Sequence, residues 1–283
     1  MNCKQLLDKG FKYLKINKIL NPKLDSELLL SKVLKKNRSE ILINLNKEID
    51  QKKYQEYNIY LSRRKKKEPI AYILGFKNFW KYKFLINNST LIPRPETEHI
   101  VEQALNCLPL TKSGKILDIG TGSGCIIISI LKERHKCRAT AIDISVKALK
   151  VAKTNANLHH LGNKIKFFNI DIDKYNSSKY DLILSNPPYI NNIDLNRLDE
   201  DVKLFEPKEA LCGGLDGYKE IRKVIEKSSK LLKYNGKLII EIGYNQKNYA
   251  LKLLKNNDFF INKICKDLSG KDRCIVSTKY NNR

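Results

Sequence analysis

Residues 115–131 read KILDIGTGSGCIIISIL, and this stretch decides the fold. An apolar run ends in glycines at every second position, and an apolar helical pattern follows directly. Glycines let the backbone approach a ligand that any Cβ atom would obstruct. Ligands of open α/β sheets bind beside such a turn, outside the carboxyl ends of the strands. The stretch therefore predicts a strand, a ligand-binding loop and a helix.

The predicted loop consists of Gly120, Thr121, Gly122, Ser123 and Gly124. Its spacing differs from the GxGxxG of dinucleotide-binding proteins, and no Gly-Lys-Ser/Thr follows as in a Walker loop. The N–H groups at the start of the following helix suit a carboxylate. This combination favours S-adenosylmethionine, whose methionine end carries a carboxylate. We predict that these five residues contact that cofactor.

Strand and helix patterns alternate on both sides of this loop. Alternating βα units predict a mainly parallel sheet with helices on both faces. A Leu-Ser-Gly turn joins the last two strands and predicts a terminal β-hairpin. We therefore expect an α/β, Rossmann-like class I methyltransferase domain with a mostly parallel seven-stranded sheet. The predicted strands are residues 115–120, 138–143, 164–169, 180–185, 237–242, 259–266 and 272–278.

Acidic residues follow two of the predicted strands and extend the cofactor site. Asp143 ends the second strand, where a carboxylate can accept both hydroxyls of a ribose; a helix cap is the alternative role. Asp171 and Ile172 follow the third strand and are placed beside the adenine, as a hydrogen-bond acceptor and an apolar wall. A turn is the alternative role for Asp171.

The first seventy or so residues have helical patterns. Pro22 follows a capping asparagine, and Asp50 begins a helix that runs to Lys67. Aromatic residues gather after residue 69, and Asn87-Asn88 predicts a hairpin turn. We therefore divide the chain into a small helical domain at residues 1–75, an aromatic-rich β-hairpin connector at residues 76–95, and a methyltransferase domain at residues 96–283.

Composition excludes some classes and leaves one question open. No apolar run approaches the roughly 20 residues of a membrane span, and the start of the chain lacks an apolar signal core, so we expect a cytoplasmic protein. The seven cysteines form no C-x-x-C pair, which disfavours zinc sites and disulfide frameworks. The net charge of +24 includes 44 lysines. We interpret it as compositional bias, with clusters such as residues 63–67 as the alternative docking patch.

The second chemical motif is Asn186, Pro187, Pro188 and Tyr189, at the carboxyl end of an apolar strand. A proline-stiffened turn would be the purely structural explanation. An amide nitrogen is a poor nucleophile because its lone pair is delocalised. The Asn186 side-chain oxygen and the Pro187 carbonyl can accept both protons of a substrate –NH2, and Tyr189 can pack on the substrate amide. The motif therefore predicts methyl transfer to an amide or amino nitrogen, without metal.

At this point the chain resembles the HemK/PrmC-type glutamine-N5 methyltransferases, which modify peptide chain release factors. The tetrapeptide alone is shared with adenine-N6 DNA methyltransferases, so the combination with a helical N-terminal domain carries the resemblance. The matching segments are EPIAYILG at residues 68–75, LIPRPETE at 91–98, ILDIGTGSG at 116–124, AIDIS at 141–145, SNPPY at 185–189 and GKDR at 270–273.

The resemblance implies a reaction, a partner and roles for residues. It implies methyl transfer from S-adenosylmethionine, leaving S-adenosylhomocysteine, to the glutamine in the GGQ loop of class 1 release factors. The helical domain is then implied to help hold the release factor. Asn186 is implied to contact both cofactor and substrate, whereas Ile172 departs from members that have an aromatic residue there. We expect a monomer that does not bind nucleic acid directly; the alternatives are a ribosomal-protein glutamine methyltransferase and an adenine-N6 methyltransferase.

Overall fold

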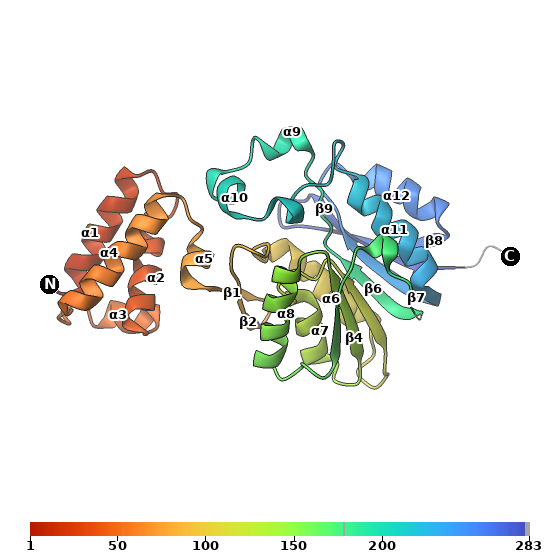
Figure 1. Cartoon of the computed structure of the whole chain (residues 1–283), viewed down its shortest axis with the longest axis horizontal. Helices are drawn as coiled ribbons and strands as arrows, with labels where there is room; N and C mark the ends of the chain where they lie inside the picture. The colour runs from red at the N-terminus through yellow and green to blue at the C-terminus, as the bar shows by residue number, and fades with distance from the viewer. Residues whose placement is uncertain (178, 281–283) are drawn as a thin grey trace. The chain divides into compact units, whose positions relative to one another are not determined.

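The computed structural model describes residues 1–177 and 179–280. The chain divides into two compact units (Figure 1). The first comprises Met1–Phe76 together with Asp199–Phe205, and the second comprises the other described residues from Lys77 onward. Among the described residues, no helix is long and apolar enough to cross a membrane.

The first unit is helical. Asn2 and Gln5 form a capping box at the start of its first helix, and Asp50 accepts a hydrogen bond from the Lys53 N–H, as the sequence predicted for a helix beginning there. Leu6, Leu29 and other apolar side chains are fully buried between the helices. The helices are α1 (Cys3–Ile16), α2 (Pro22–Leu34), α3 (Arg38–Ile43), α4 (Gln51–Lys65), α5 (Ile70–Leu74) and α10 (Glu200–Phe205).

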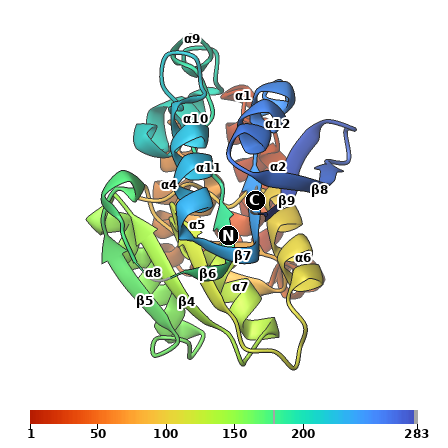
Figure 2. The same cartoon turned by 90° about the vertical axis from the view of Figure 1, so that its right-hand side faces the viewer.

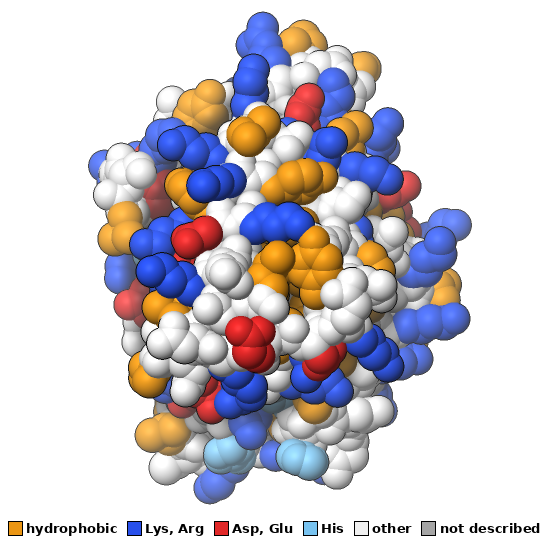
Figure 3. Space-filling view, turned by 90° about the vertical axis from the view of Figure 1, so that its left-hand side faces the viewer, with side chains coloured by type: hydrophobic (Ala, Val, Ile, Leu, Met, Phe, Trp, Pro, Cys, Tyr) orange, Lys and Arg blue, Asp and Glu red, His pale blue; other side chains and the backbone are white. Residues whose placement is uncertain are grey.

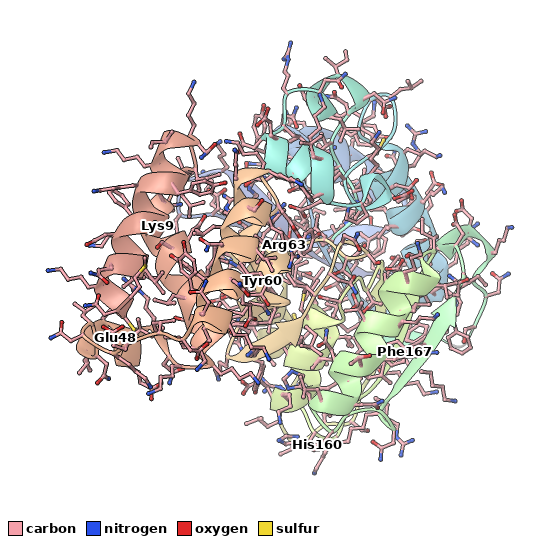
Figure 4. All side chains as sticks on the ribbon, turned by 60° about the vertical axis from the view of Figure 1, so that its left-hand side comes forward. Lys9, Glu48, Tyr60, Arg63, His160 and Phe167 are labelled. Carbon is pink, nitrogen blue, oxygen red and sulfur yellow. The ribbon has the colours of Figure 1, made fainter. Side chains whose placement is uncertain are left out.

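Two arginines of α4 have different environments. The buried Arg64 guanidinium pairs with Asp25 at 2.7 Å and lies 3.7 Å from Asp201 of α10. Arg63 pairs instead with Glu68 at 2.6 Å, and Figure 4 shows it beside Tyr60, whose ring centroid is 5.8 Å away. Arg63 and Arg64 therefore both form ion pairs within the first unit, so the cluster at residues 63–67 is not a uniform charged surface.

A two-stranded hairpin, β1 (Phe76–Phe79) and β2 (Tyr82–Leu85), follows. It turns at Trp80, whose φ is 55°, and not at Asn87-Asn88 as the sequence predicted. The Glu98 carboxylate holds this turn by accepting the Trp80 N–H at 2.7 Å. Asn87 begins a separate turn in which its side chain accepts the Ser89 N–H. The expected position was wrong because Asn-Asn chemistry also suits such a local turn.

The sheet confirms the fold class. Its order is β5-β4-β3-β6-β7-β9-β8, with β3 to β7 parallel and the terminal hairpin antiparallel. Figure 2 shows β5, β4, β6 and β7 in this sequence across the sheet. The strands are β3 (Lys115–Ile119), β4 (Arg138–Asp143), β5 (Ile165–Asn169), β6 (Tyr180–Ser185), β7 (Leu232–Glu241), β8 (Phe259–Lys266) and β9 (Asp272–Lys279).

Helices cover both faces of this sheet, as parallel strands require. Ile116 of β3 joins the apolar core with α6 (Glu98–Cys107) and α7 (Cys125–Glu133). Its neighbour Leu117 points to the other face, with α11 (Lys219–Leu231) and α12 (Lys247–Asn256). The connections reverse direction between β3 and β6, where ligands of such sheets bind.

Candidate active site

A cavity of about 860 Å³ lies at the carboxyl edge of the sheet, within the second unit. Segments that follow β3, β4, β5 and β6 line it, together with residues 88–91, 93 and 94, the stretch before α11 and the first turns of α11. Every site residue predicted from the sequence lines this cavity except Gly124 and Tyr189. The volume falls in the range of cofactor sites.

The glycine loop explains why one wall of the cavity is open. Gly120 and Gly122 have φ values of 72° and 56°, and no atom lies within 4 Å of a Cβ built on either. Gly124, at φ 79°, instead packs toward α7 and α8 (Val146–Leu158), where such a Cβ would meet Ile128 at 3.0 Å. Gly124 has no side chain to cap α7, so the first N–H groups of that helix remain for a ligand.

Asp118 lies under this loop and is fully buried. One carboxyl oxygen accepts the Thr121 hydroxyl at 2.6 Å, whereas the other has no partner among the described residues. Burial, with a smaller contribution from Asp143, raises the pKa of Asp118 to about 7. An unpaired buried acceptor fits a cofactor that brings a positively charged donor to the glycine loop.

Asp143 connects the end of β4 to the loop. Its carboxylate accepts the Gly122 N–H at 2.9 Å and the Ser145 N–H at 2.8 Å. Burial raises its pKa, and these backbone N–H groups oppose that rise. The cap of α8 is Ser145, which accepts the Ala148 N–H, so Asp143 itself is not the helix cap.

Asp171 and Ile172 form the wall beyond β5. The Asp171 side chain accepts the Asp173 N–H at 2.8 Å and lies 3.4 Å from Lys223 of α11. Burial raises the Asp171 pKa, but the backbone N–H and Lys223 outweigh it and lower the pKa overall. Ile172 is buried in the apolar core yet lines the cavity. Asp171 therefore does make the turn considered as its alternative role, while also facing the cavity.

Asn186 begins the second motif at the end of β6. Its Nδ2 donates to the Thr97 hydroxyl at 3.1 Å, and that hydroxyl donates to the buried Glu241 carboxylate at 2.7 Å. No described residue donates a hydrogen bond to Asn186 Oδ1 or to the Pro187 carbonyl. These two oxygens are thus acceptors without an internal partner at the cavity.

The backbone of the tetrapeptide is held from behind. A Cβ built on Gly213 would lie 2.9 Å from both the Pro188 carbonyl and the Tyr189 Cα. Gln246 donates to the Tyr189 carbonyl at 3.3 Å and to the Gly217 carbonyl at 2.8 Å. Tyr189 does not line the cavity, and burial, together with Glu241, raises its pKa to about 12.

Sequence patterns did not single out several residues that hold the site. Thr97 lies within the segment at residues 91–98 and Glu241 within a predicted strand, and neither was predicted to support the site. Asn155 of α8 was also missed; its amide donates to the carbonyls of Leu85 and Ser123, both at 2.9 Å. The available signal was position, because Glu241 is the last residue of β7, at the same carboxyl edge as Asn186.

Among residues 1–177 and 179–280, no group of three or more His, Cys, Asp and Glu side chains could hold a metal ion. The sheet order, terminal hairpin, glycine loop and unpaired Asp118 oxygen together define a class I methyltransferase that uses S-adenosylmethionine. Family models match at two places: the PrmC N-terminal domain at residues 5–75 and the methyltransferase small domain at residues 101–200.

Relatives then identify the family. A release factor glutamine methyltransferase from Fusobacterium nucleatum is 39% identical, covering 97% of this chain and 78% of that protein. One from Buchnera aphidicola subsp. Schizaphis graminum is 37% identical, covering 99% and 100%. A methyltransferase structure from Pyrococcus furiosus shares the fold, with a TM-score of 0.54 and 17% identity over 81% of this chain and 99% of that one. The chain belongs to the release factor glutamine methyltransferase family.

Proposed function

We propose that this chain methylates the side-chain nitrogen of the glutamine in the GGQ loop of class 1 peptide chain release factors. The methyl group comes from S-adenosylmethionine, which becomes S-adenosylhomocysteine. The family relationship over nearly the whole chain supports this reaction. The observation that carries it is the pair of acceptors at Asn186 Oδ1 and the Pro187 carbonyl, which matches an –NH2 group with two protons.

Each residue of the tetrapeptide has a proposed role. Asn186 and Pro187 accept hydrogen bonds from the two amide N–H groups, orient the nitrogen lone pair and stabilise the positive charge that develops on the nitrogen. One of the two N–H protons is released to solvent as the N–CH3 bond replaces it. Pro188 helps to shape the substrate site. Tyr189, which does not line the cavity in this structure, packs against the substrate amide once substrate is bound. When bound, the cofactor supplies an electrophilic methyl group. No side chain has to form a covalent bond to the substrate.

The cofactor is proposed to lie along the loop of Gly120, Thr121, Gly122, Ser123 and Gly124. Its carboxylate faces the uncapped start of α7. The Asp143 carboxylate accepts the ribose hydroxyls. Asp171 and Ile172 bound the adenine, and Asn186 contacts the methionine end, according to the same proposal.

The N-terminal helices favour a release factor over a ribosomal protein or an adenine base as the substrate. Residues 5–75 match the PrmC N-terminal domain. We propose that residues 1–75 hold the release factor, with residues 76–95 as the connector and residues 96–283 as the methyltransferase domain. We further infer that the chain acts in the cytoplasm as a monomer without binding nucleic acid, which light scattering and a gel-shift assay with RNA would test.

The decisive experiment is methyl transfer from labelled S-adenosylmethionine to purified candidates. A release factor, its glutamine-to-alanine form, ribosomes and duplex DNA are each incubated with the enzyme, and the methylated residue is located by mass spectrometry. Label confined to the glutamine of the intact release factor is expected. Equal labelling of the substituted factor, or stronger labelling of ribosomes or DNA, would contradict the proposed substrate.

A further inference from the structure

A chain of hydrogen bonds runs from the tetrapeptide into the core of the second unit. It joins Asn186 Nδ2 to Thr97 Oγ1 at 3.1 Å and Thr97 Oγ1 to Glu241 Oε2 at 2.7 Å. Thr97 and Glu241 are 3% and 2% exposed, so water cannot readily replace either partner. Buried side chains of this kind give a hydrogen-bond network a fixed geometry.

The chemistry of the three groups gives this chain a direction. An ionised carboxylate can only accept, so the single hydroxyl hydrogen of Thr97 is donated to Glu241. The Thr97 oxygen can then only accept from Asn186. The Asn186 amide must therefore turn its Nδ2 toward Thr97 and its Oδ1 away from it. The wrong amide orientation would bring two oxygens together without a hydrogen between them.

We propose that Thr97 and Glu241 are positioning residues that select the amide orientation in which Asn186 presents its oxygen to the substrate nitrogen. A freely rotating amide would present its NH2 group part of the time, and that group repels the N–H protons of a substrate amide. The inference deepens the proposed function and rests on it, because only a substrate –NH2 requires an acceptor at this position.

The surroundings of Glu241 determine the pH range in which the chain of hydrogen bonds has this direction. Burial raises the Glu241 pKa to about 7, while the Thr97 hydrogen bond and the charges of Arg273 and Arg94 oppose the rise, and Glu96 adds to it. Two further titratable groups lie beside this carboxyl: Tyr189, whose pKa is raised by burial, and Cys274 of β9, whose pKa is raised mainly by its hydrogen bond to Cys265. Below about pH 7 a protonated Glu241 can donate to Thr97, and the direction of the chain is lost.

Substitutions at both ends of the hydrogen-bond chain, Asn186 and Glu241, can reverse its direction and so test the proposal. Asn186→Asp places an acceptor against the Thr97 oxygen, whose hydrogen is already donated to Glu241. Adding Glu241→Gln provides an NH2 donor to Thr97, which frees the Thr97 hydrogen for the new carboxylate at position 186. Glu241→Gln alone retains a carbonyl acceptor, so the Asn186 enzyme should lose only part of its activity.

Glu241→Gln is expected to change kcat in opposite directions in the Asn186 enzyme and in the Asn186→Asp enzyme. Glu241→Gln should lower kcat for the release factor by about two- to tenfold in the Asn186 enzyme and raise it by at least about fivefold in the Asn186→Asp enzyme. The rise of kcat with pH through about 7 should disappear in Glu241→Gln. A role of Glu241 in folding alone would shift the thermal midpoint but would lower activity in both backgrounds.

Thr97→Val removes the hydroxyl at nearly constant volume and should lower kcat by roughly 10- to 100-fold, with little change in the Kd for S-adenosylmethionine. Thr97→Ser should restore most of the activity. Thr140→Val is the matched control, since Thr140 is a buried threonine of β4 whose hydroxyl accepts from Tyr180 at 3.2 Å. It should lower the thermal midpoint while leaving kcat within about twofold.

The outcomes separate this inference from the proposed function. If the unsubstituted enzyme does not methylate release factor, the proposed substrate fails. If it does, but the double variant is no more active than Asn186→Asp, the positioning inference is overturned, even should Thr97→Val fail to fold.

Discussion

The backbone of Gly213 lies against that of Tyr189, so closely that a Cβ atom at position 213 would come within 2.9 Å of the Tyr189 Cα. The Gly213 N–H also donates to the Ile190 carbonyl at 2.9 Å. The loop before α11 is thus a rigid support for the tetrapeptide. Contacts this short cannot be relieved by rotating a side chain, because the crowded atoms belong to the backbone.

Gly213→Ala should therefore displace the tetrapeptide and lower kcat by about 10- to 100-fold, since small misplacements of catalytic groups have effects of this size. Gly114→Ala is the matched control, because a Cβ there would make ordinary contacts of 3.5 Å with Cys137 and Leu108. Steady-state methylation of release factor measures both variants. Full activity of Gly213→Ala would mean that the tetrapeptide does not depend on this support.

Asn186→Ala should lower turnover by roughly 10²–10³-fold, as expected when one electrostatic catalytic group is removed. The substitution takes away the acceptor for one substrate proton and leaves the Thr97 oxygen without its donor. Cofactor affinity should change much less, because most of its proposed contacts lie elsewhere. Single-turnover kinetics and calorimetry on the same preparation separate the two effects. A loss confined to cofactor affinity would assign Asn186 to the cofactor alone.

Asp143→Ala should weaken S-adenosylmethionine binding by roughly 1–3 kcal/mol through lost hydrogen bonds to a charged acceptor. The loss has two sources, the ribose hydroxyls and the Gly122 N–H that Asp143 holds. Asp173→Ala is a suitable control, since Asp173 is an acid near the site that does not line the cavity. Calorimetry that gives the same Kd for Asp143→Ala and the unsubstituted enzyme would refute the ribose assignment.

The buried Asp118 predicts a dependence of stability on pH. Its pKa rises from 3.8 to about 7 on folding, so its favourable contribution is complete below pH 3.8 and is lost as pH rises through 7. Without cofactor, Asp118→Asn should therefore raise the free energy of unfolding more at pH 8 than at pH 5. One pKa unit corresponds to about 1.4 kcal/mol, so the difference should be a few kcal/mol at most. Urea unfolding at the two pH values measures it, and an equal effect at both would show that Asp118 does not titrate in this range.

Lys65 and Lys66 test whether the positive charge serves docking. Both are exposed, on the chain that follows a buried Arg64. Lys and Arg side chains are spread widely over the face shown in Figure 3. If the charge is compositional, replacing Lys65 and Lys66 with glutamine should change the methylation rate by less than about twofold at physiological salt.

A docking patch would instead make the association rate fall and lose its salt dependence. Arg64→Gln must be kept out of this test. It would break the buried pair with Asp25, which is expected to destabilise the fold by about 3–5 kcal/mol.

The sheet could be predicted because its strands have local signatures. The limits of β4, β6 and β8 agree with the sequence pattern; turn-forming residues mark the end of β6 at Asn186 and both ends of β8, at Asp258 and Asp267. β7 begins at Leu232, five residues before the predicted 237, because Leu232 pairs with Tyr180 of β6 ahead of an irregularity in which Asn235 has φ 61°. α11 starts at Lys219 because Asp216 first closes a turn on the Tyr218 N–H.

The partners of the site residues could not be predicted in the same way. Thr97 and Asn186 are 89 positions apart, and Thr97 and Glu241 are 144 apart. No local pattern distinguishes a threonine that supports an amide from one that ends a turn. Such contacts are set by the order of strands in the sheet, which places the end of β7 beside the end of β6.

The segment Asp199–Phe205 folds with the helices of the first unit although it lies in the chain between β6 and β7. Translation therefore delivers the parts of that unit at very different times. Helices α1 to α5 emerge from the ribosome first, and domains generally begin to fold as they emerge. Asp201, which lies 3.7 Å from the buried Arg64, follows only after β3, β4, β5 and β6 have been synthesised. The first unit to begin folding is thus completed only when most of the second has left the ribosome.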